Sequence, residues 1–337
     1  MAKNYNSDQA KIYIICSDLC SEQFEKGLKD KNYDGDITVL PSYKKLPRGY
    51  IQVAALKSPD LDFSLTSPIA NIVLGKPGKI DLSLFKDLPK TKTPEHLETL
   101  TRKITQNIKG INFKDVYQGF VLQGTKVLNG HVVSLRGTKT LQEWIMNALA
   151  IQIPILPFWS QELSKNTKLQ AKLSSAKVHL GFLIQYALMA KQVFDGVEKA
   201  KNNSGKGLPL NVTGYSRGGG LAVLVSLATF ITNALPVQML TFAGPRVGDP
   251  NFKWIFDLLI NKAIRVVNMA DIVPVLPPES IEIAGQTFEY AHVGKEASFL
   301  WQTGDLINNH LEYDNAVKLN VPTITPPMPN KPVTGRP

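Results

Sequence analysis

Short apolar runs alternate with longer amphipathic stretches over the second half of the chain. The runs at 210–213, 238–242 and 263–268 have the length and the Val, Ile, Leu and Phe content of buried strands. The stretches between them, at 219–232 and 251–261, have the length and the apolar spacing of helices. This alternation predicts an α/β fold, in which helices cover both faces of a mostly parallel sheet.

The N-terminal third has a less regular pattern. Residues 11–16 form an apolar run that predicts a buried strand, and a short helix is expected near 20–30. Short apolar runs over 31–95 are interrupted by Pro, Gly, Asp and Lys, which predicts a small β-rich or loop-rich region. A polar helix is expected at 94–108.

A hairpin is expected next, because apolar runs at 118–122 and 131–135 flank a turn that contains glycines. Between the hairpin and the regular alternation the pattern predicts three helices, at 141–148, 161–174 and 178–201. An apolar stretch at 151–159, broken by two prolines, lies among these helices.

These patterns predict one large domain with additions at both ends. A length of 337 residues corresponds to two ordinary domains or to one large domain with an extension. We expect an N-terminal extension or small subdomain over 1–110, an α/β domain over 111–320 and a tail over 321–337. The tail is rich in proline and is expected to be extended or disordered.

Composition narrows the class of protein. With 43% apolar and 20% charged residues, the chain is globular rather than disordered or fibrous. No uninterrupted apolar run reaches the ~18 residues of a transmembrane helix, and the polar start of the chain predicts no secretory signal, unless one was removed before residue 1. We therefore expect a cytoplasmic protein, with export by a leaderless route as the alternative. Cys16 and Cys20 are expected to be free thiols, with no disulfide framework and no metal site.

The net charge of +10 could serve nucleic acid binding, an anionic membrane surface or solubility. Only seven of the 38 basic residues are arginines, and no basic run is interleaved with aromatic residues. Nucleic acid is therefore not an expected partner. Diffuse lysine charge fits peripheral contact with an anionic membrane surface, or simply a solvated exterior.

The strongest chemical signal is a G-x-S-x-G motif made by Gly214, Ser216 and Gly218. An apolar strand enters the motif and a helix leaves it, which is the setting of a nucleophilic serine on a sharp turn. Such a turn strains the serine backbone and brings its neighbours so close that only glycine fits two positions away on either side. The alternatives are a glycine-rich phosphate cradle or an ordinary strand-to-helix turn.

A nucleophilic serine needs a base and an acid that orients the base. In α/β-hydrolases the acid and then the histidine follow the serine along the chain. Asp271 follows a predicted strand and is expected at the same sheet edge as the serine, whereas Asp249 and Asp257 are rivals in a turn and on a helix. Downstream histidines are His292, in a strand-like run, and His310, in a turn entering a helix. The loop position favours His310.

The oxyanion that forms during acyl transfer needs preorganised hydrogen-bond donors. One donor is expected to be the backbone N–H of Arg217, directly after the serine. Thr138, which follows the strand at 131–135, could supply the second donor, although an ordinary strand-end turn would look the same.

Seven segments in the chain resemble the class 3 (fungal-type) lipase family of the α/β-hydrolase superfamily, in the family's order: 135–138, 178–182, 212–219, 241–249, 265–278, 290–294 and 310–313. They fall within 115–315, more than half of the chain. The resemblance implies an α/β-hydrolase fold with Ser216 as nucleophile, Asp271 as acid and His310 as base. It implies an oxyanion hole from Thr138 and Arg217, and no metal or organic cofactor. It also makes His292 structural.

Two features depart from the family pattern. Tyr215 and Arg217 flank the serine where the family usually has His and Leu. The Arg217 cation could favour a phosphate-bearing or otherwise anionic substrate, or it could pair with a nearby carboxylate. The apolar stretch at 151–159 lies where the family carries its lid, and packing of an extra core element is the alternative.

The sequence thus predicts a serine esterase or lipase that hydrolyses carboxylic ester bonds of acyl lipids through an acyl-enzyme. Phospholipase A1-like or lysophospholipase activity competes with triacylglycerol hydrolysis. The alternative from another class is a catalytically silent lipase-like interaction module.

Overall fold

The computed structural model describes residues 5–59, 114–138, 150–155, 172, 174–204, 207–283, 285–319 and 321–323. The helices expected at 94–108 and 141–148 lie outside these residues. So do 156–159, most of the helix expected at 161–174, and the chain beyond 323. The predicted domain boundaries at 110 and 320 both fall on undescribed residues, and they stay predictions.

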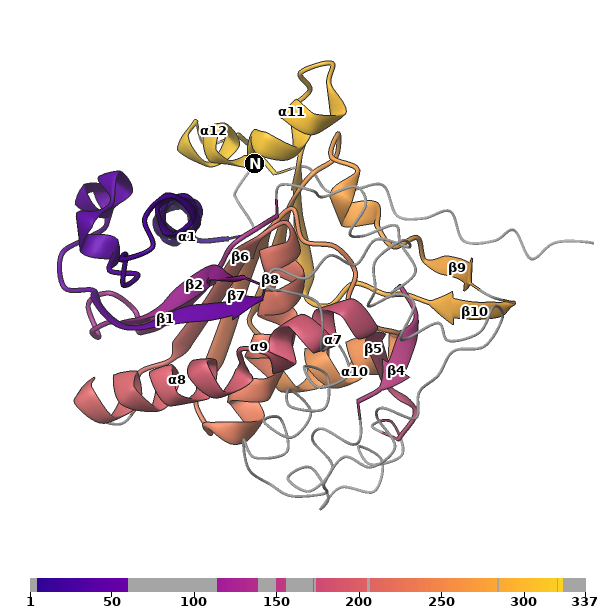
Figure 1. Ribbon diagram of the computed structural model, residues 1–337. Helices are drawn as coiled ribbons and strands as arrows, with labels where there is room; N and C mark the ends of the chain where they lie inside the picture. Colours follow the sequence, from indigo (N-terminus) through magenta and orange to yellow (C-terminus); the bar gives the residue numbers. More distant parts are fainter. Residues whose placement is uncertain are drawn as a thin grey trace, which may run out of the picture.

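A seven-stranded sheet is the centre of the fold (Figure 1). In spatial order its strands are β1 (Ile51–Pro59), β2 (Asp115–Gln123), β3 (His131–Leu135), β6 (Leu210–Tyr215), β7 (Val237–Phe242), β8 (Ala263–Asn268) and β11 (Lys295–Phe299). The strands from β3 to β11 run parallel, while β1–β2 and β2–β3 are antiparallel. The predicted hairpin and the mostly parallel sheet are confirmed. All five parallel strands end at the same edge.

Two apolar cores lie on opposite faces of the sheet because side chains alternate along each strand. One core packs α7 (Leu180–Ala187), α8 (Ala190–Ser204), α9 (Arg217–Thr232) and α10 (Pro250–Leu259) on strand residues such as Val212. The other packs α1 (Ser7–Lys29) and α12 (Tyr313–Lys318) on residues such as Phe242. Helices therefore cover both faces, as expected for an α/β fold (Figure 1).

Small elements complete the domain. Two-stranded sheets are formed by β4 (Gln152–Pro154) with β5 (Lys177–His179), and by β9 (Ser280–Ile283) with β10 (Gln286–Glu289). Short helical turns are η1 (Ile37–Val39), η2 (Pro41–Lys45), η4 (Val273–Val275) and α11 (Leu306–Leu311). Among the described residues, no helix combines the length and apolarity needed to span a bilayer.

The prediction of a strand at 11–16 is wrong, because this run lies inside the 23-residue helix α1. The side chain of Asn6 accepts hydrogen bonds from the backbone N–H groups of Asp8 and Gln9, which starts the helix. Buried positions such as Ala10, Tyr13 and Ile14 then recur at helical spacing against the sheet. Packing along one helix face outweighs the strand preference of a short isoleucine-rich run.

The prediction of one helix over 178–201 is also wrong in its bounds. The chain forms strand β5, helix α7 and helix α8, and the two helices are separated at residues 188–189.

The described part of the apolar stretch at 151–159 belongs to the core, since Ile151, Ile153 and Ile155 are buried and β4 pairs with β5.

The described N-terminal residues are built into the main sheet. Strand β1 pairs with β2 along its whole length, and α1 packs against β2 and β3. The N-terminal residues therefore form one edge of the sheet and cover one of its faces.

Asp18 on α1 lies at the junction between α1 and α12. Burial, followed by the nearby carboxylate of Asp314, raises the pKa of Asp18 to about 6, while Lys45 and Lys318 oppose the shift. The folded state therefore binds the Asp18 proton more tightly than the unfolded chain does, and stability is lost as the pH rises from about 4 through about 6.

We expect Asp18→Asn to raise the free energy of unfolding near pH 8 by about 1 kcal/mol, a figure discounted for the partial exposure of Asp18. The gain should shrink towards zero as the pH falls below about 4, as measured by urea unfolding at several pH values. Asp195→Asn, at a half-exposed position on α8, is the control and should give no pH-dependent gain. A gain that stays constant with pH would contradict the role given to Asp18.

Candidate active site

Ser216 lies on the sharp turn between β6 and α9. Its φ of 58° and ψ of −124° are a backbone conformation that residues other than glycine rarely adopt. A Cβ on Gly214 would lie 2.1 Å from the carbonyl oxygen of Gly218, and a Cβ on Gly218 would lie 2.2 Å from that of Leu135. The crossing of β6 and α9 next to β3 therefore requires glycine at both positions.

The other two candidate residues come from further along the same sheet edge. Asp271 follows β8, and His310 lies on α11, which the chain reaches after β11. The distance between His310 Nδ1 and Asp271 Oδ2 is 2.8 Å. Because parallel strands end at one edge, residues 39 positions apart in the chain meet there.

The side chain of Asp271 is fully buried and accepts three hydrogen bonds. Oδ2 accepts from His310 and, at 2.8 Å, from the hydroxyl of Tyr313, while Oδ1 accepts from the backbone N–H of Val273 at 2.9 Å. An ionised carboxylate only accepts hydrogen bonds, so this set of donors fits the charged form. The carboxylate thereby fixes His310 as the tautomer that carries its proton on Nδ1 and leaves Nε2 able to accept.

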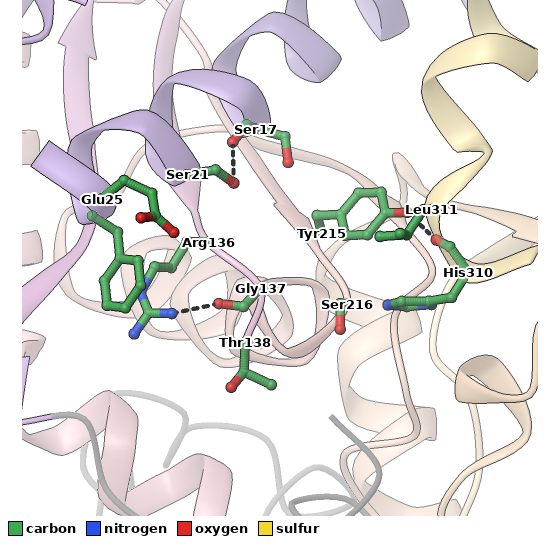
Figure 2. A pocket seen from close by; sticks show the side chains of 11 residues that line it. Ser17, Ser21, Glu25, Arg136, Gly137, Thr138, Tyr215, Ser216, His310 and Leu311 are labelled. Carbon is green, nitrogen blue, oxygen red and sulfur yellow. Dashed lines mark hydrogen bonds between the residues drawn. The ribbon is translucent and has the colours of Figure 1, made fainter. Parts of the chain in front are cut away.

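Ser216 and His310 line the same cavity of about 210 Å³. Figure 2 shows the imidazole of His310 directed towards Ser216. The Ser216 hydroxyl is buried and has no hydrogen-bond partner among the described residues. Hydrogen bonds between catalytic groups are often loose before substrate binds, so this arrangement is compatible with proton transfer from the serine to the histidine.

Tyr215 is a site residue whose role sequence reasoning missed. Its hydroxyl donates a hydrogen bond to the backbone carbonyl of His310, and the two rings meet edge to face with centroids 5.4 Å apart. The side chain also lines the cavity (Figure 2). Tyr215 therefore connects the turn that carries Ser216 to the helix that carries His310.

A second missed contact involves Tyr313 and Asn268. The hydroxyl of Tyr313 donates to Asp271 and accepts from the backbone N–H of Asn268 at 2.9 Å. The Asn268 side chain donates to the carbonyls of Trp301 and Asn309, at 2.9 and 2.8 Å. These bonds join the end of β8 to the loop that leads into α11. Tyr313 was visible in the sequence only as part of the segment 310–313.

Asp249 and Asp257, the alternatives to Asp271, and His292, the alternative to His310, have structural partners away from the cavity. Asp249 caps α10 by accepting from the backbone N–H of Phe252 at 2.7 Å, and Asp257 accepts from that of Gly294 at 2.6 Å. His292 Nε2 donates to the carbonyl of Pro274 at 2.5 Å. Burial and the nearby Arg265 cation hold the pKa of His292 well below its usual value. None of these three residues lines the cavity that contains Ser216.

His179 also has a structural role. It caps α7 by accepting a hydrogen bond from the backbone N–H of Gly181 at 3.0 Å. Burial lowers the pKa of His179 to about 3, so the imidazole stays neutral.

The loop after β3 lies against the serine. A Cβ on Gly137 would be 3.3 Å from the Cβ of Ser216, and Thr138 lines the cavity (Figure 2). The backbone of Arg217 begins α9 directly after the serine, at the end of the helix where the dipole favours negative charge. Thr138 therefore lies beside the cavity, and the backbone N–H of Arg217 directly follows Ser216.

The interpretation of the Arg217 side chain as a contact for an anionic substrate is wrong. Only 1% of Arg217 is exposed, and its Nη2 donates to Gln118 Oε1 on β2 at 2.7 Å. The guanidinium is therefore buried beneath the site. A different cation, Arg136, lines the cavity, with Nε donating to the carbonyl of Tyr117 and its guanidinium 3.8 Å from the ring centroid of Phe24.

One wall of the cavity comes from α1, which the sequence pattern did not predict. Ser17, Ser21, Phe24 and Glu25 line the cavity together with Ser216 and His310. Figure 2 shows Ser17, Ser21 and Glu25 on this helix. Their spacing of about four residues places them on one face of the helix. Among the described residues, no group of His, Cys, Asp and Glu side chains could hold a metal ion.

A strained serine at a parallel strand-to-helix turn, with a carboxylate–imidazole pair from later strand ends, is the arrangement typical of a serine hydrolase site on an α/β-hydrolase fold. Residues 132–281 match the family described as "Lipase (class 3)". The region around the site is similar to the class 3 lipase family, which confirms the resemblance inferred from the sequence.

Three proteins illustrate this similarity. "Phospholipase A1-Igamma2, chloroplastic" of Arabidopsis thaliana is 29% identical over 220 residues, which cover 56% of this chain and 40% of that protein. "Lipase" of Rhizopus niveus is 30% identical over 129 residues, which cover 37% of this chain and 31% of that protein. A solved structure of a Rhizomucor miehei lipase propeptide complex aligns over 58% of this chain and 62% of its own, at 25% identity and a TM-score of 0.46. The chain spans less than half the length of these two curated relatives.

Replacing Tyr215 by Phe should slow ester hydrolysis without unfolding the protein, because it removes only the hydroxyl that holds the His310 carbonyl. We expect kcat for a soluble short-chain ester to fall about tenfold while KM changes little, and stability to fall by about 1 kcal/mol. Tyr50→Phe is the matched control, since it also removes one tyrosine-to-carbonyl bond, to Leu128, away from the site. Equal kcat in the two variants would show that Tyr215 does not position the base.

Proposed function

We propose that this chain is a serine esterase that hydrolyses carboxylic ester bonds of acyl lipids through an acyl-enzyme intermediate. The observation that carries the proposal is the 2.8 Å bond between His310 and Asp271 beside a cavity that both His310 and Ser216 line. In this arrangement a buried carboxylate orients an imidazole towards a strained serine, which is the arrangement that activates an alcohol for acyl transfer.

In the proposed reaction Ser216 Oγ attacks the ester carbonyl carbon and gives its proton to His310 Nε2. Asp271 stabilises the imidazolium that forms. The backbone N–H of Arg217 and a donor from Thr138 bind the oxyanion of the tetrahedral intermediate. His310 then returns the proton to the departing alcohol, which leaves an acyl group on Ser216. Water activated by His310 attacks this acyl-enzyme and releases the carboxylic acid.

The proposed substrates are acyl lipids, with phospholipase A1-like or lysophospholipase activity ahead of triacylglycerol hydrolysis. The curated relatives support this class, since they are named phospholipases A1 and lipases. The support comes from these names and not from the Arg217 side chain, which is buried away from the cavity.

We further propose peripheral contact with an anionic membrane surface, supported by the net charge of +10. The proposed location is a reducing compartment such as the cytoplasm, since Cys16 and Cys20 are both free and buried. Several of the plant relatives are named as chloroplastic proteins.

A fluorophosphonate probe should label the protein, because it reacts with serines that are activated by a neighbouring base. The Ser216→Ala variant should remove the labelling while the protein stays folded, as judged by circular dichroism. Absence of labelling in the natural protein would favour the catalytically silent interaction module.

The two downstream histidines should respond differently to substitution. His310→Ala should lower kcat/KM for a soluble ester by about 10³-fold or more, because the serine loses its base. His292→Ala, which removes the bond to Pro274 and the buried ring outside the cavity, should keep most of kcat/KM and should lower the melting temperature instead. The reverse pattern would transfer the role of the base to His292.

A further inference from the structure

Gln118, near the start of strand β2, lies at the sheet edge that carries the two predicted oxyanion donors. Strand β2 runs antiparallel to β3, whereas β3 and β6 run parallel, so β2 begins at the edge where β3 and β6 end. Gln118 is fully buried and directly precedes Gly119, which pairs with Leu135 at the end of β3. No motif in the sequence pointed to this residue.

Gln118 bonds to both segments that carry the predicted donors. Its backbone carbonyl accepts from the backbone N–H of Arg136 at 3.0 Å, two positions before Thr138. Its side-chain Oε1 accepts from Arg217 Nη2 at 2.7 Å, and the backbone N–H of Arg217 is the other predicted donor. One residue of β2 therefore holds the loop after β3 through its main chain and the start of α9 through its side chain.

The loop after β3 and the start of α9 also lie directly against each other. A Cβ on Gly218 would lie 2.2 Å from the carbonyl oxygen of Leu135 and 2.6 Å from that of Arg136. Arg136 fixes the loop further, because its Nε donates to the carbonyl of Tyr117 at 2.9 Å and its Nη1 to that of Gly137 at 2.8 Å (Figure 2). With so little space between the backbones, a shift of the start of α9 changes the separation of the two donors.

Only one end of the Gln118 amide is used. Oε1 accepts the bond from Arg217, whereas Nε2 is buried without a hydrogen-bond partner among the described residues. A buried amide with an unpaired N–H group destabilises a protein. Packing alone therefore does not explain a glutamine at this position, and the bond to Arg217 does.

We propose that Gln118 is a positioning residue of the oxyanion hole, which holds the Arg217 side chain and thereby fixes the backbone N–H of Arg217 relative to Thr138. The inference rests on the proposed function, because the oxyanion forms only during acyl transfer. Donors to the oxyanion stabilise the tetrahedral state more than the bound ester, so displacing them slows the reaction without weakening substrate binding. Acylation and deacylation both pass through a tetrahedral intermediate, so kcat falls whichever step limits turnover.

The first test removes the acceptor and keeps the approximate length of the side chain. Gln118→Met should lower kcat for a soluble short-chain ester about tenfold and leave KM nearly unchanged. Gln185→Met is the matched control and should keep kcat. Gln185 is also fully buried, bonds through its Nε2 to the Ser58 hydroxyl at 2.6 Å, and lies outside the lining of the cavity.

The second test treats Gln118 and Arg217 as a pair. Arg217→Met keeps the backbone N–H and removes the other half of the same bond. The two single variants and the double variant should therefore lower kcat by about the same factor. The double variant buries no unpaired charge, so it serves as the test if Gln118→Met is too unstable to measure. A double variant with the kcat of the natural protein would overturn the proposal, and so would two losses that multiply.

The third test measures the oxyanion itself with a trifluoromethyl ketone. Ser216 Oγ adds to the carbonyl carbon, its proton passes to His310 Nε2, and the carbonyl electron pair becomes an oxyanion. The inhibition constant should rise about tenfold in Gln118→Met and stay constant in Gln185→Met. An inhibition constant that does not change in Gln118→Met would contradict the proposal.

These measurements separate this inference from the proposed function. A natural protein that neither hydrolyses esters nor forms the adduct would overturn the proposed function and this inference with it. A natural protein that hydrolyses the ester, with equal kcat in Gln118→Met and Gln185→Met, would overturn this inference alone.

Discussion

The hydrogen bond between His310 and Asp271 is the interaction on which the site depends. It forms between two segments that follow different strands, so it exists only if β8 and β11 run parallel and end at the same edge. Tyr313 and Asn268 bond the two segments to each other, and Tyr215 bonds the helix that carries His310 to the turn that carries Ser216. Residues at the ends of β6, β8 and β11 therefore all help to hold the imidazole of His310 in place.

The same network explains the surface beside the site. Because α11 uses Asn309 and His310 to hold the site together, its apolar side chains face solvent. An exposed apolar surface would be a liability for a protein that works only in water. The position of the His310 imidazole and the exposure of these apolar side chains therefore follow from one arrangement of one short helix.

The sequence predicted the parts of the fold that depend on local pattern. The strand at 263–268 has the bounds that were predicted, and β6, β7, α9 and α10 lie within a few residues of their predicted places. The α/β class and the resemblance to class 3 lipases followed from these elements and from the motif segments. The glycines that flank Ser216 could be predicted because the required backbone geometry itself excludes a Cβ.

Features that depend on contacts between distant residues were not predictable. The run at 11–16 satisfies a strand pattern locally, and only the packing of α1 on the sheet selects a helix. The wall that α1 gives to the cavity and the burial of Arg217 beneath it also depend on which surfaces meet in three dimensions. The pattern of α11 likewise gives the spacing of apolar residues but not which side of the helix faces the core.

The most direct test of the account is mass spectrometry of the protein quenched during turnover of an ester that deacylates slowly. The account predicts an acyl adduct on the peptide that contains Ser216, and hydrolysis without any such adduct, or with the acyl group on another residue, would contradict it.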